Sequence, residues 1–177
     1  MDKKKNILLV MPKNQFDEDE LFFVRDFFSS PEYKLVILSG LGQEAVGNKK
    51  TRFTPDGMIV DWNKHLQDQR KYDAVIVTGG KGAKKSLWDD PILPQILTDH
   101  HRAGSVVATS GMAAPVLGSS SLAQGEVAAP GNEDVVARLN DYRLAVAEEG
   151  LVSYHRVVSA RDASVMPEFC EAIRQLL

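Results

Sequence analysis

Five short blocks of apolar, β-branched residues set the strongest limit on how this 177-residue chain can fold. They do not alternate apolar with polar positions, so both faces of each strand are expected to be buried, as in a parallel sheet covered by helices. Segments with helical periodicity separate them, which predicts a doubly wound, flavodoxin-like α/β sandwich with a mainly parallel sheet. The blocks are "ILLVM" at 7–11, "LVILSG" at 35–40, "AVIVTGG" at 74–80, "SVVATS" at 105–110 and "VVSAR" at 157–161.

Four segments between or after these blocks carry the pattern of helices. In the second of them Asp90 is expected to cap the helix, Pro91 to take its first position and Gly104 to end it. The third is shorter and has Pro115 in its first turns. The predicted helices cover 19–28, 90–104, 111–122 and 166–177.

Two regions depart from this alternation of strands and helices. Residues 41–60 are expected to form an antiparallel excursion with turns at 47–48 and 55–57. Residues 143–161 are expected to form two short strands joined by a turn near 154–156. No internal repeat or linker divides the chain, so residues 1–177 are interpreted as a single domain.

Composition narrows the class of protein. With 44% hydrophobic and 25% charged residues and a net charge of −3, nucleic-acid binding is disfavoured, although lysines cluster at 3–5, 49–50 and 81–85. The longest apolar run, 7–11, is too short to span a membrane or to act as a signal peptide. A single cysteine allows no intrachain disulfide and fits a reducing compartment. We expect a soluble cytoplasmic protein with no membrane contact.

The expected site lies beyond the carboxyl ends of the strands, where open parallel sheets bind ligands. Strand ends should bring Glu20, the Gly79-Gly80 turn, Ser110 and Arg161 together there. Ser110 follows a strand and precedes a helix. A sharp turn of this kind lifts its corner side chain above the sheet, often with strained dihedral angles, where helix amides stabilise negative charge.

The pattern around Ser110 has both a catalytic and a structural interpretation. Gly111 and the Gly79-Gly80 turn leave room for backbone N–H groups to approach a substrate oxygen, as an oxyanion hole requires. The esterase signature G-x-S-x-G is absent, however, since Ala108 and Met112 flank the serine. Serine is also a common residue at the start of a helix.

Four stretches in order resemble the ThiJ/PfpI family of the class I glutamine amidotransferase-like superfamily. The resemblance implies a cysteine nucleophile at the strand–helix elbow and an acid from the first helix beside it. A two-glycine turn and the amide after the nucleophile would supply the oxyanion hole. These roles fall on Ser110, Glu20, Gly79 with Gly80, and Gly111, and the arginine of the last strand end falls on Arg161. The stretches are "ILLVMPKNQFDEDEL", "YDAVIVTGGKGAKKSL", "SVVATSGMAAPVLGSSSLAQGEVAAPG" and "VVSARDASVMPEFCEAI".

The chain departs from that family at four positions. Serine replaces the elbow cysteine, and Gly111 stands where protease-like members carry a histidine. Ala129 stands where other members place a histidine before a proline, and Thr78 replaces the proline before the glycine pair. Serine needs a hydrogen-bonded base to act as a nucleophile, whereas cysteine ionises near neutrality with modest help. The nucleophile and its usual histidine partners are therefore both missing.

None of the four histidines is expected to act as the base for the Ser110 hydroxyl. Chain direction places His65, His100, His101 and His155 near the amino ends of the strands, the wrong edge of the sheet. All four are interpreted as surface residues.

Several remaining residues have two interpretations. Glu20 is either a buried carboxyl with a raised pKa aimed at Ser110, or an acid that stabilises a helix N-terminus. Arg161 either neutralises an anionic substrate or pairs with a carboxylate at a dimer interface. Cys170 is interpreted as a buried packing residue. No spacing suits a metal or a phosphate-binding loop, so no metal and no cofactor are expected.

Two functions follow from these residues. The first is an altered or inactive family member that binds a small carbonyl or acyl compound or serves a stress or partner-binding role. The second is an active hydrolase or lyase of protease-amidase or deglycase/glyoxalase type that uses Ser110 and Glu20 on a small carbonyl substrate. The family usually forms dimers, so a homodimer is expected.

Overall fold

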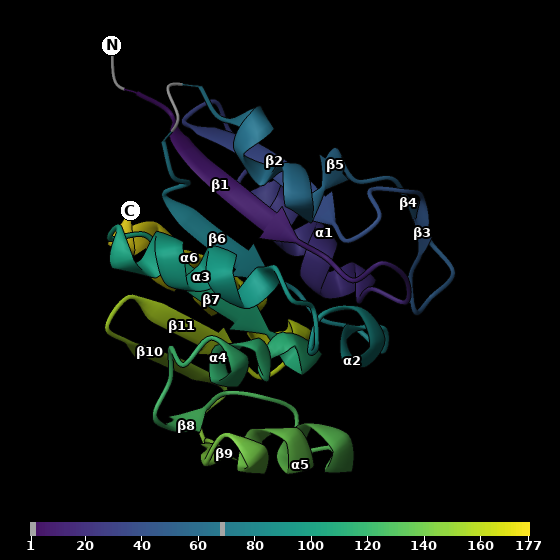
Figure 1. Ribbon diagram of the computed structural model, residues 1–177, viewed down its shortest axis with the longest axis vertical. Coiled ribbons are helices and arrows are strands. Elements are labelled where there is room, and N and C mark those ends of the chain that lie inside the picture. Colours follow the sequence, from purple (N-terminus) through teal and green to yellow (C-terminus); the bar gives the residue numbers. More distant parts are fainter. Residues whose placement is uncertain (1–2, 68–69) are drawn as a thin grey trace.

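A seven-stranded sheet forms the centre of the protein in a computed structural model that describes residues 3–67 and 70–177 (Figure 1). Its strand order is β10-β11-β7-β6-β1-β2-β5. All neighbouring pairs are parallel except β10 and β11. The prediction of a doubly wound, mainly parallel sheet is confirmed. The strands are β1 Lys5–Val10, β2 Tyr33–Ser39, β5 Gly57–Met58, β6 Ala74–Val77, β7 Val106–Ser110, β10 Leu151–Tyr154 and β11 Val157–Ala160.

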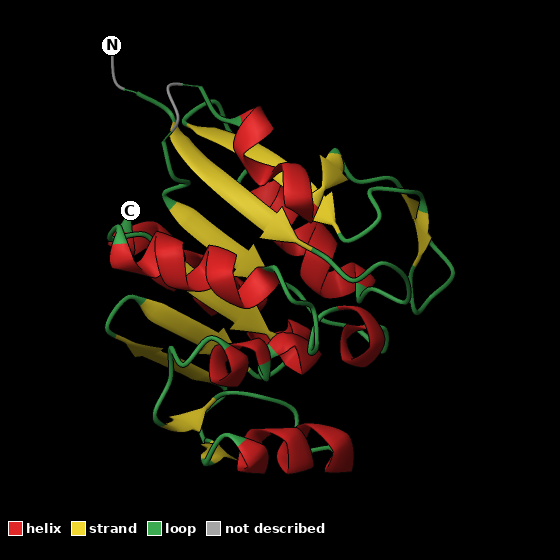
Figure 2. Ribbon diagram, in the orientation of Figure 1, coloured by secondary structure: helices red, strands yellow, loops and turns green. Residues whose placement is uncertain are grey.

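Helices cover both faces of this sheet (Figure 2). Helices α1 (Glu18–Phe27) and α6 (Met166–Leu176) pack on one face, against a cluster that includes Ile7 and Leu9 of β1. On the other face, Leu8 and Val10 belong to a second cluster with residues of several other helical segments. Because alternate residues of β1 enter both clusters, the buried part of the strand, residues 7–10, is apolar at every position. Among the helical segments that contribute to the second cluster are η1 Ile59–His65, α2 Ala83–Ser86, α3 Leu93–Arg102, α4 Val116–Ser119 and α5 Glu133–Asp141.

Two helix predictions need correction. Helix α3 begins at Leu93 rather than at Pro91, although Asp90 accepts hydrogen bonds from the N–H groups of Ile92 and Leu93 as a capping residue does. The helix predicted over 111–122 is divided into the 3₁₀ turn η2 (Gly111–Ala113) and α4. Pro115 lies at the division, because it has no N–H group to continue the helical hydrogen bonds.

The excursion at 41–60 is confirmed in part. Strands β3 (Ala45–Val46) and β4 (Arg52–Phe53) form an antiparallel pair, as expected. Strand β5 instead extends the main sheet as a parallel neighbour of β2.

The last third of the chain contains one expected hairpin and one unexpected strand pair. Strands β10 and β11 are joined through His155 and Arg156, whose φ angles of 51° and 63° suit a tight hairpin turn. Strands β8 (Gly125–Val127) and β9 (Leu144–Val146) form a separate parallel pair around α5, which the sequence pattern did not indicate. Of the helices in the described residues, none combines the length and apolarity needed to cross a bilayer.

Candidate functional site

The carboxyl ends of β6 and β7 meet the first turn of α1. Strand order reverses between β1 and β6, and at such a switch point the loops after the strands diverge and leave a crevice. Asp17 caps α1 by accepting a hydrogen bond from the N–H group of Glu20 at 2.9 Å. This cap fixes the first helical turn, and Glu20 points from it towards the two strand ends.

Glu20, Gly79 and Ser110 form one buried hydrogen-bonded group. The Oε1 atom of Glu20 accepts from the N–H group of Gly79 at 3.0 Å and from the hydroxyl of Ser110. The side chain of Glu20 is buried, and Ser110 is 0% exposed. The expected approach of Glu20 to Ser110 and to the glycine turn is therefore present.

Burial raises the pKa of Glu20 to about 7. Loss of hydration is the largest cause, and the nearby negative charges of Asp17 and Asp162 add to it. The hydrogen bonds from Ser110 and Gly79 act in the opposite direction, because they stabilise the ionised form. The carboxyl group is thus poised to hold a proton near neutral pH.

Ser110 does not stand above the sheet in a strained conformation, and that expectation is wrong. The residue has φ −129° and ψ 147°, the ordinary extended conformation of a strand, and its side chain points inward to Glu20. It is the last residue of β7 and pairs with Ala160 of β11, so the chain has not yet turned at this position.

Gly111 makes the turn instead. Its φ of +57° lies in the left-handed region that favours glycine. A Cβ atom built on this residue would overlap a carboxylate oxygen of Glu20. The corner position that faces the acid therefore has no side chain, and one could be placed there only if the Glu20 carboxyl group moved.

The glycine turn after β6 packs closely against this corner and the loop that follows β1. A Cβ atom on Gly79 would lie 2.7 Å from the backbone nitrogen of Met112, and one on Gly80 would overlap the carbonyl oxygen of Gln15. Hydrogen bonds hold the loop in place, from Asp17 N to the Gly79 oxygen and from Gly82 N to the Gln15 oxygen. Gly79, Gly80 and Gly111 are all buried, so the group around Glu20 is sealed from solvent.

Arg161 lies outside this group. Its guanidinium pairs with Asp162 at 3.4 Å and its side chain is 43% exposed. Among the described residues, neither Glu20 nor Ser110 is a hydrogen-bond partner of Arg161. Asp162, which sequence reasoning did not single out, influences the site by raising the pKa of Glu20.

The four histidines lie elsewhere, but one of them is not a surface residue. His100 is 0% exposed, and its ring packs against Trp62 and Tyr72. The correction has a simple cause: His100 follows Ile96 and Leu97 by four and three residues, which places it on the buried stripe of α3. The same burial lowers the pKa of His100.

The other histidine assignments agree with the structure where it tests them. The ring of His101 contacts the backbone oxygen of His155 at 2.8 Å. Both residues therefore lie beside the amino end of β11. In the described part of the chain, no histidine is a hydrogen-bond partner of Ser110. Cys170 is a packing residue as expected, since it is 0% exposed and burial raises its pKa to about 12.

These features define a class: a doubly wound α/β protein with a buried acid from its first helix set against a strand–helix corner. A sequence profile of the DJ-1/PfpI family matches residues 5–176, and the chain belongs to this family.

Solved structures with the same fold agree with this assignment. A ThiJ/PfpI domain protein from Brachyspira murdochii is 21% identical, with a TM-score of 0.83 over 99% of this chain and 97% of that one. DJ-1beta of Drosophila melanogaster is 17% identical, with a TM-score of 0.80 over 98% of this chain and 90% of that one. An uncharacterised protein of Methanocaldococcus jannaschii is 26% identical over 126 residues, which span 71% of this chain and 59% of that protein's length.

Proposed function

We propose that this chain is a DJ-1/PfpI family member that has no nucleophilic chemistry at its elbow. The observation that carries the proposal is Gly111, the left-handed corner residue whose missing side chain leaves Glu20 without a facing nucleophile. Among the described residues, the one hydroxyl that bonds Glu20 belongs to Ser110, which is buried and already donates its proton to the carboxyl group. A nucleophile must reach its substrate and have a base within hydrogen-bond distance. Ser110 is inaccessible, and no imidazole of the described residues is its hydrogen-bond partner.

In this proposal the group around Glu20 is structural. The carboxyl group joins α1 to the ends of β6 and β7 through Gly79 and Ser110. Without this acceptor the N–H group of Gly79 and the hydroxyl of Ser110 would be buried and unpaired, and each unpaired group would cost about 1 to 3 kcal/mol. The protein then serves by binding a ligand or a partner, and a cytoplasmic homodimer is part of the same proposal.

The alternative is a hydrolase or lyase in which Ser110 attacks and Glu20 handles the proton. One observation favours it, namely that the pKa of Glu20, about 7, suits a group that gives and takes protons near neutrality. It requires the loop after β1 to open, since Ser110 is otherwise inaccessible.

A panel of four proteins separates the two functions: the natural chain, Ser110→Ala, Ser110→Cys and Glu20→Gln. Each is assayed with methylglyoxal, small esters and small amides, after circular dichroism has confirmed that it is folded. We expect no turnover by the natural chain. Turnover that is lost in Ser110→Ala would establish the alternative and end the proposal.

The Ser110→Cys protein adds a test that does not depend on the choice of substrate. A thiol at this position should be as sealed as the hydroxyl it replaces, so iodoacetamide should label it only after unfolding. The matched control is the natural chain, whose single cysteine, Cys170, is also buried. We call the buried group of Glu20, Gly79, Ser110 and Gly111 the sealed corner. Rapid labelling of the folded Ser110→Cys protein would show that this corner is open to solvent.

A further inference from the structure

An open hollow of about 430 Å³ lies beside the sealed corner. Three segments line it: the loop after β1, the turn between β3 and β4, and the start of α2. These segments lie at the same side of the molecule in Figure 1, although more than 60 residues separate the first from the last. The hollow has no role in the proposed function.

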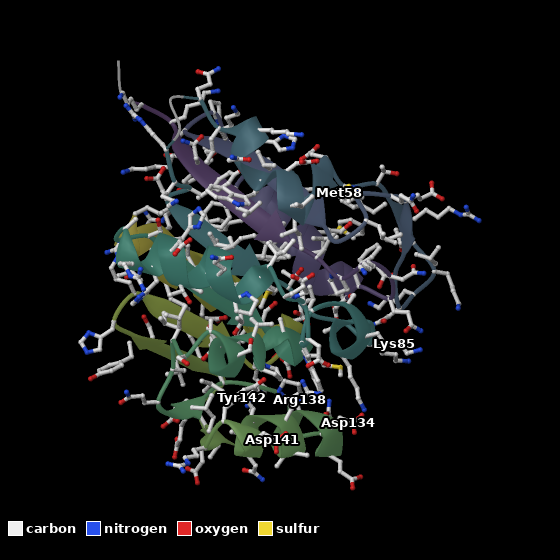
Figure 3. The ribbon with its side chains drawn as sticks, viewed as in Figure 1. Met58, Lys85, Asp134, Arg138, Asp141 and Tyr142 are labelled. Carbon is white, nitrogen blue, oxygen red and sulfur yellow. The ribbon has the colours of Figure 1, made fainter. Side chains whose placement is uncertain are left out.

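Two lysine clusters that are distant in the sequence meet at this hollow. Lys50, Lys81 and Lys85 line it, and Figure 3 shows Lys85 extending from the outer side of α2. Their sequence neighbours are neutralised: Lys49 pairs with Asp19 at 2.6 Å and Lys84 with Asp134 at 3.2 Å. Among the described residues, no carboxylate lies within ion-pair distance of the three lining lysines, and no acidic residue lines the hollow.

The asparagine side chains in the walls also present donors. The Oδ1 atom of Asn14 accepts from the N–H group of Val46 at 2.7 Å, and that of Asn48 accepts from the N–H group of Lys81 at 3.4 Å. Because a backbone N–H group can only donate, both amide oxygens must face the protein, which leaves their Nδ2 groups available. The hollow therefore offers positive charges and N–H donors.

The walls are braced by their own hydrogen bonds. Gln15 N donates to the Val46 oxygen at 2.7 Å, Asn48 N to the Phe16 oxygen at 2.9 Å and Gly82 N to the Gln15 oxygen at 3.1 Å. These bonds join all three segments and use the carbonyl oxygens that would otherwise repel an anion. Preformed walls favour binding because little ordering is required when the ligand arrives.

Two residues of the hollow have left-handed backbone conformations that are uncommon for non-glycine residues. The φ angle is 51° at Gln15 and 72° at Lys50. Each such conformation costs on the order of 1 kcal/mol and persists only where the surrounding structure enforces it. At Gln15 the hydrogen bonds of its own N–H and carbonyl groups do so. At Lys50 the bond from its N–H group to the Gly47 oxygen does so, together with the bonds from the N–H groups of residues 49 and 51 to the Glu18 carboxylate.

We propose that this hollow binds the phosphate group of a small phosphorylated molecule. A phosphate monoester carries nearly two negative charges and three acceptor oxygens, which match ammonium groups and amide donors arriving from several directions. A planar carboxylate is better matched by the fork of an arginine, and the cations that line this hollow are all lysines. The volume accommodates the phosphate and a small organic group attached to it.

Nuclear magnetic resonance of the full chain tests the site, with phenyl phosphate as the probe and benzoate as the carboxylate control at low ionic strength. We expect saturable shifts of amides at 14–15, 46–50 and 81–85 with phenyl phosphate and weak effects with benzoate. A second basic hollow, lined by Lys3, Lys4, Lys34 and Arg70, serves as an internal control for general attraction between opposite charges. Equal shifts in both hollows, equal affinity for benzoate, or no shifts at all would overturn the proposal.

Substitutions assign the binding to particular side chains. We expect Lys81→Gln and Lys85→Gln each to weaken phenyl phosphate binding about threefold, and the triple variant with Lys50→Asn to weaken it more than about tenfold. The matched control is Lys84→Gln, which removes the same charge from the position next to Lys85 in α2, but from a lysine paired with Asp134. An equal loss in Lys84→Gln would show that net charge rather than the hollow is responsible, and would refute the assignment.

Discussion

The sealed corner at Glu20 and the open hollow at Lys81 lie on two sides of the same loop, residues 11–17. On the corner side, the loop closes over Gly80, and the Glu20 carboxyl group takes its donors from the chain itself. On the hollow side, Asn14 and Gln15 of this loop face lysines that have no carboxylate partner among the described residues. Buried polar groups that satisfy one another are typical of a structural site, whereas unsatisfied donors on rigid walls are typical of a ligand site.

The difference between the two regions originates at Gly111. A residue with a side chain at this corner would hold the Glu20 carboxyl group away from the strand ends, because its Cβ atom would occupy the same space. With glycine there, the carboxyl group reaches Gly79 and Ser110 directly. The contact of Glu20 with both strand ends therefore depends on one residue that lacks a side chain.

The largest effect is expected from Gly111→Ala. A left-handed alanine costs about 1 to 2 kcal/mol, and overlap with the Glu20 carboxyl group adds a similar amount or more, so we expect a loss of about 4 kcal/mol in unfolding free energy. Urea unfolding followed by tryptophan fluorescence measures it. The control is Gly125→Ala, where φ is +76° but no atom lies within 4 Å of the added Cβ, so that only the conformational cost remains.

Equal losses in these two alanine variants would contradict the comparison. They would show that Glu20 moves aside at little cost, and that closure of the corner depends on the loop after β1 rather than on the missing side chain.

A smaller effect is expected from the pH dependence of stability. The pKa of Glu20 in the fold, about 7, lies above the ordinary value of 4.5 that applies when the chain is unfolded. The folded state therefore binds more protons between these values, so the contribution of Glu20 is complete below pH 4.5 and is lost as the pH rises through 7. The difference corresponds to about 3 kcal/mol.

The Glu20→Gln protein isolates this contribution, because glutamine resembles the protonated acid at every pH. Unfolding free energies measured from about pH 5 to about pH 9 should fall for the natural chain relative to the variant. At the alkaline end the variant should be the more stable protein. Parallel curves would mean that the carboxyl group remains ionised or hydrated in the fold, and that the corner is open to water.

The sequence predicts the frame of the sealed corner because strand ends are easy to locate. Apolar blocks ending at Thr78 and Ser110, together with a helix that begins near Glu20, are sufficient to place these residues at one edge of a parallel sheet. Whether Ser110 or Gly111 makes the turn cannot be decided from strand periodicity, which does not locate the end of a strand to within one residue. The glycine at 111 was the available signal, since it is the residue best able to take a positive φ.

Two other features show where sequence reasoning stops. His100 had a local signal in its spacing from Ile96 and Leu97, and helical periodicity applied one turn further would have placed it inside. The hollow had no such signal. The lysines at 50 and 81 are visible as separate clusters, but their meeting depends on hydrogen bonds between three loops, which are tertiary contacts.

The smallest effect on stability is expected from removing the three lysines of the hollow. They are exposed and have no ion-pair partner among the described residues, so Lys50→Asn, Lys81→Gln and Lys85→Gln together should change the unfolding free energy by less than about 0.5 kcal/mol without ligand. Phenyl phosphate should stabilise the natural chain in proportion to the logarithm of its concentration above the dissociation constant. The triple variant should need more than about ten times as much phenyl phosphate for the same stabilisation. A loss of more than about 1 kcal/mol without ligand would show that these lysines support folding, and the contrast between a structural corner and a binding hollow would then fail.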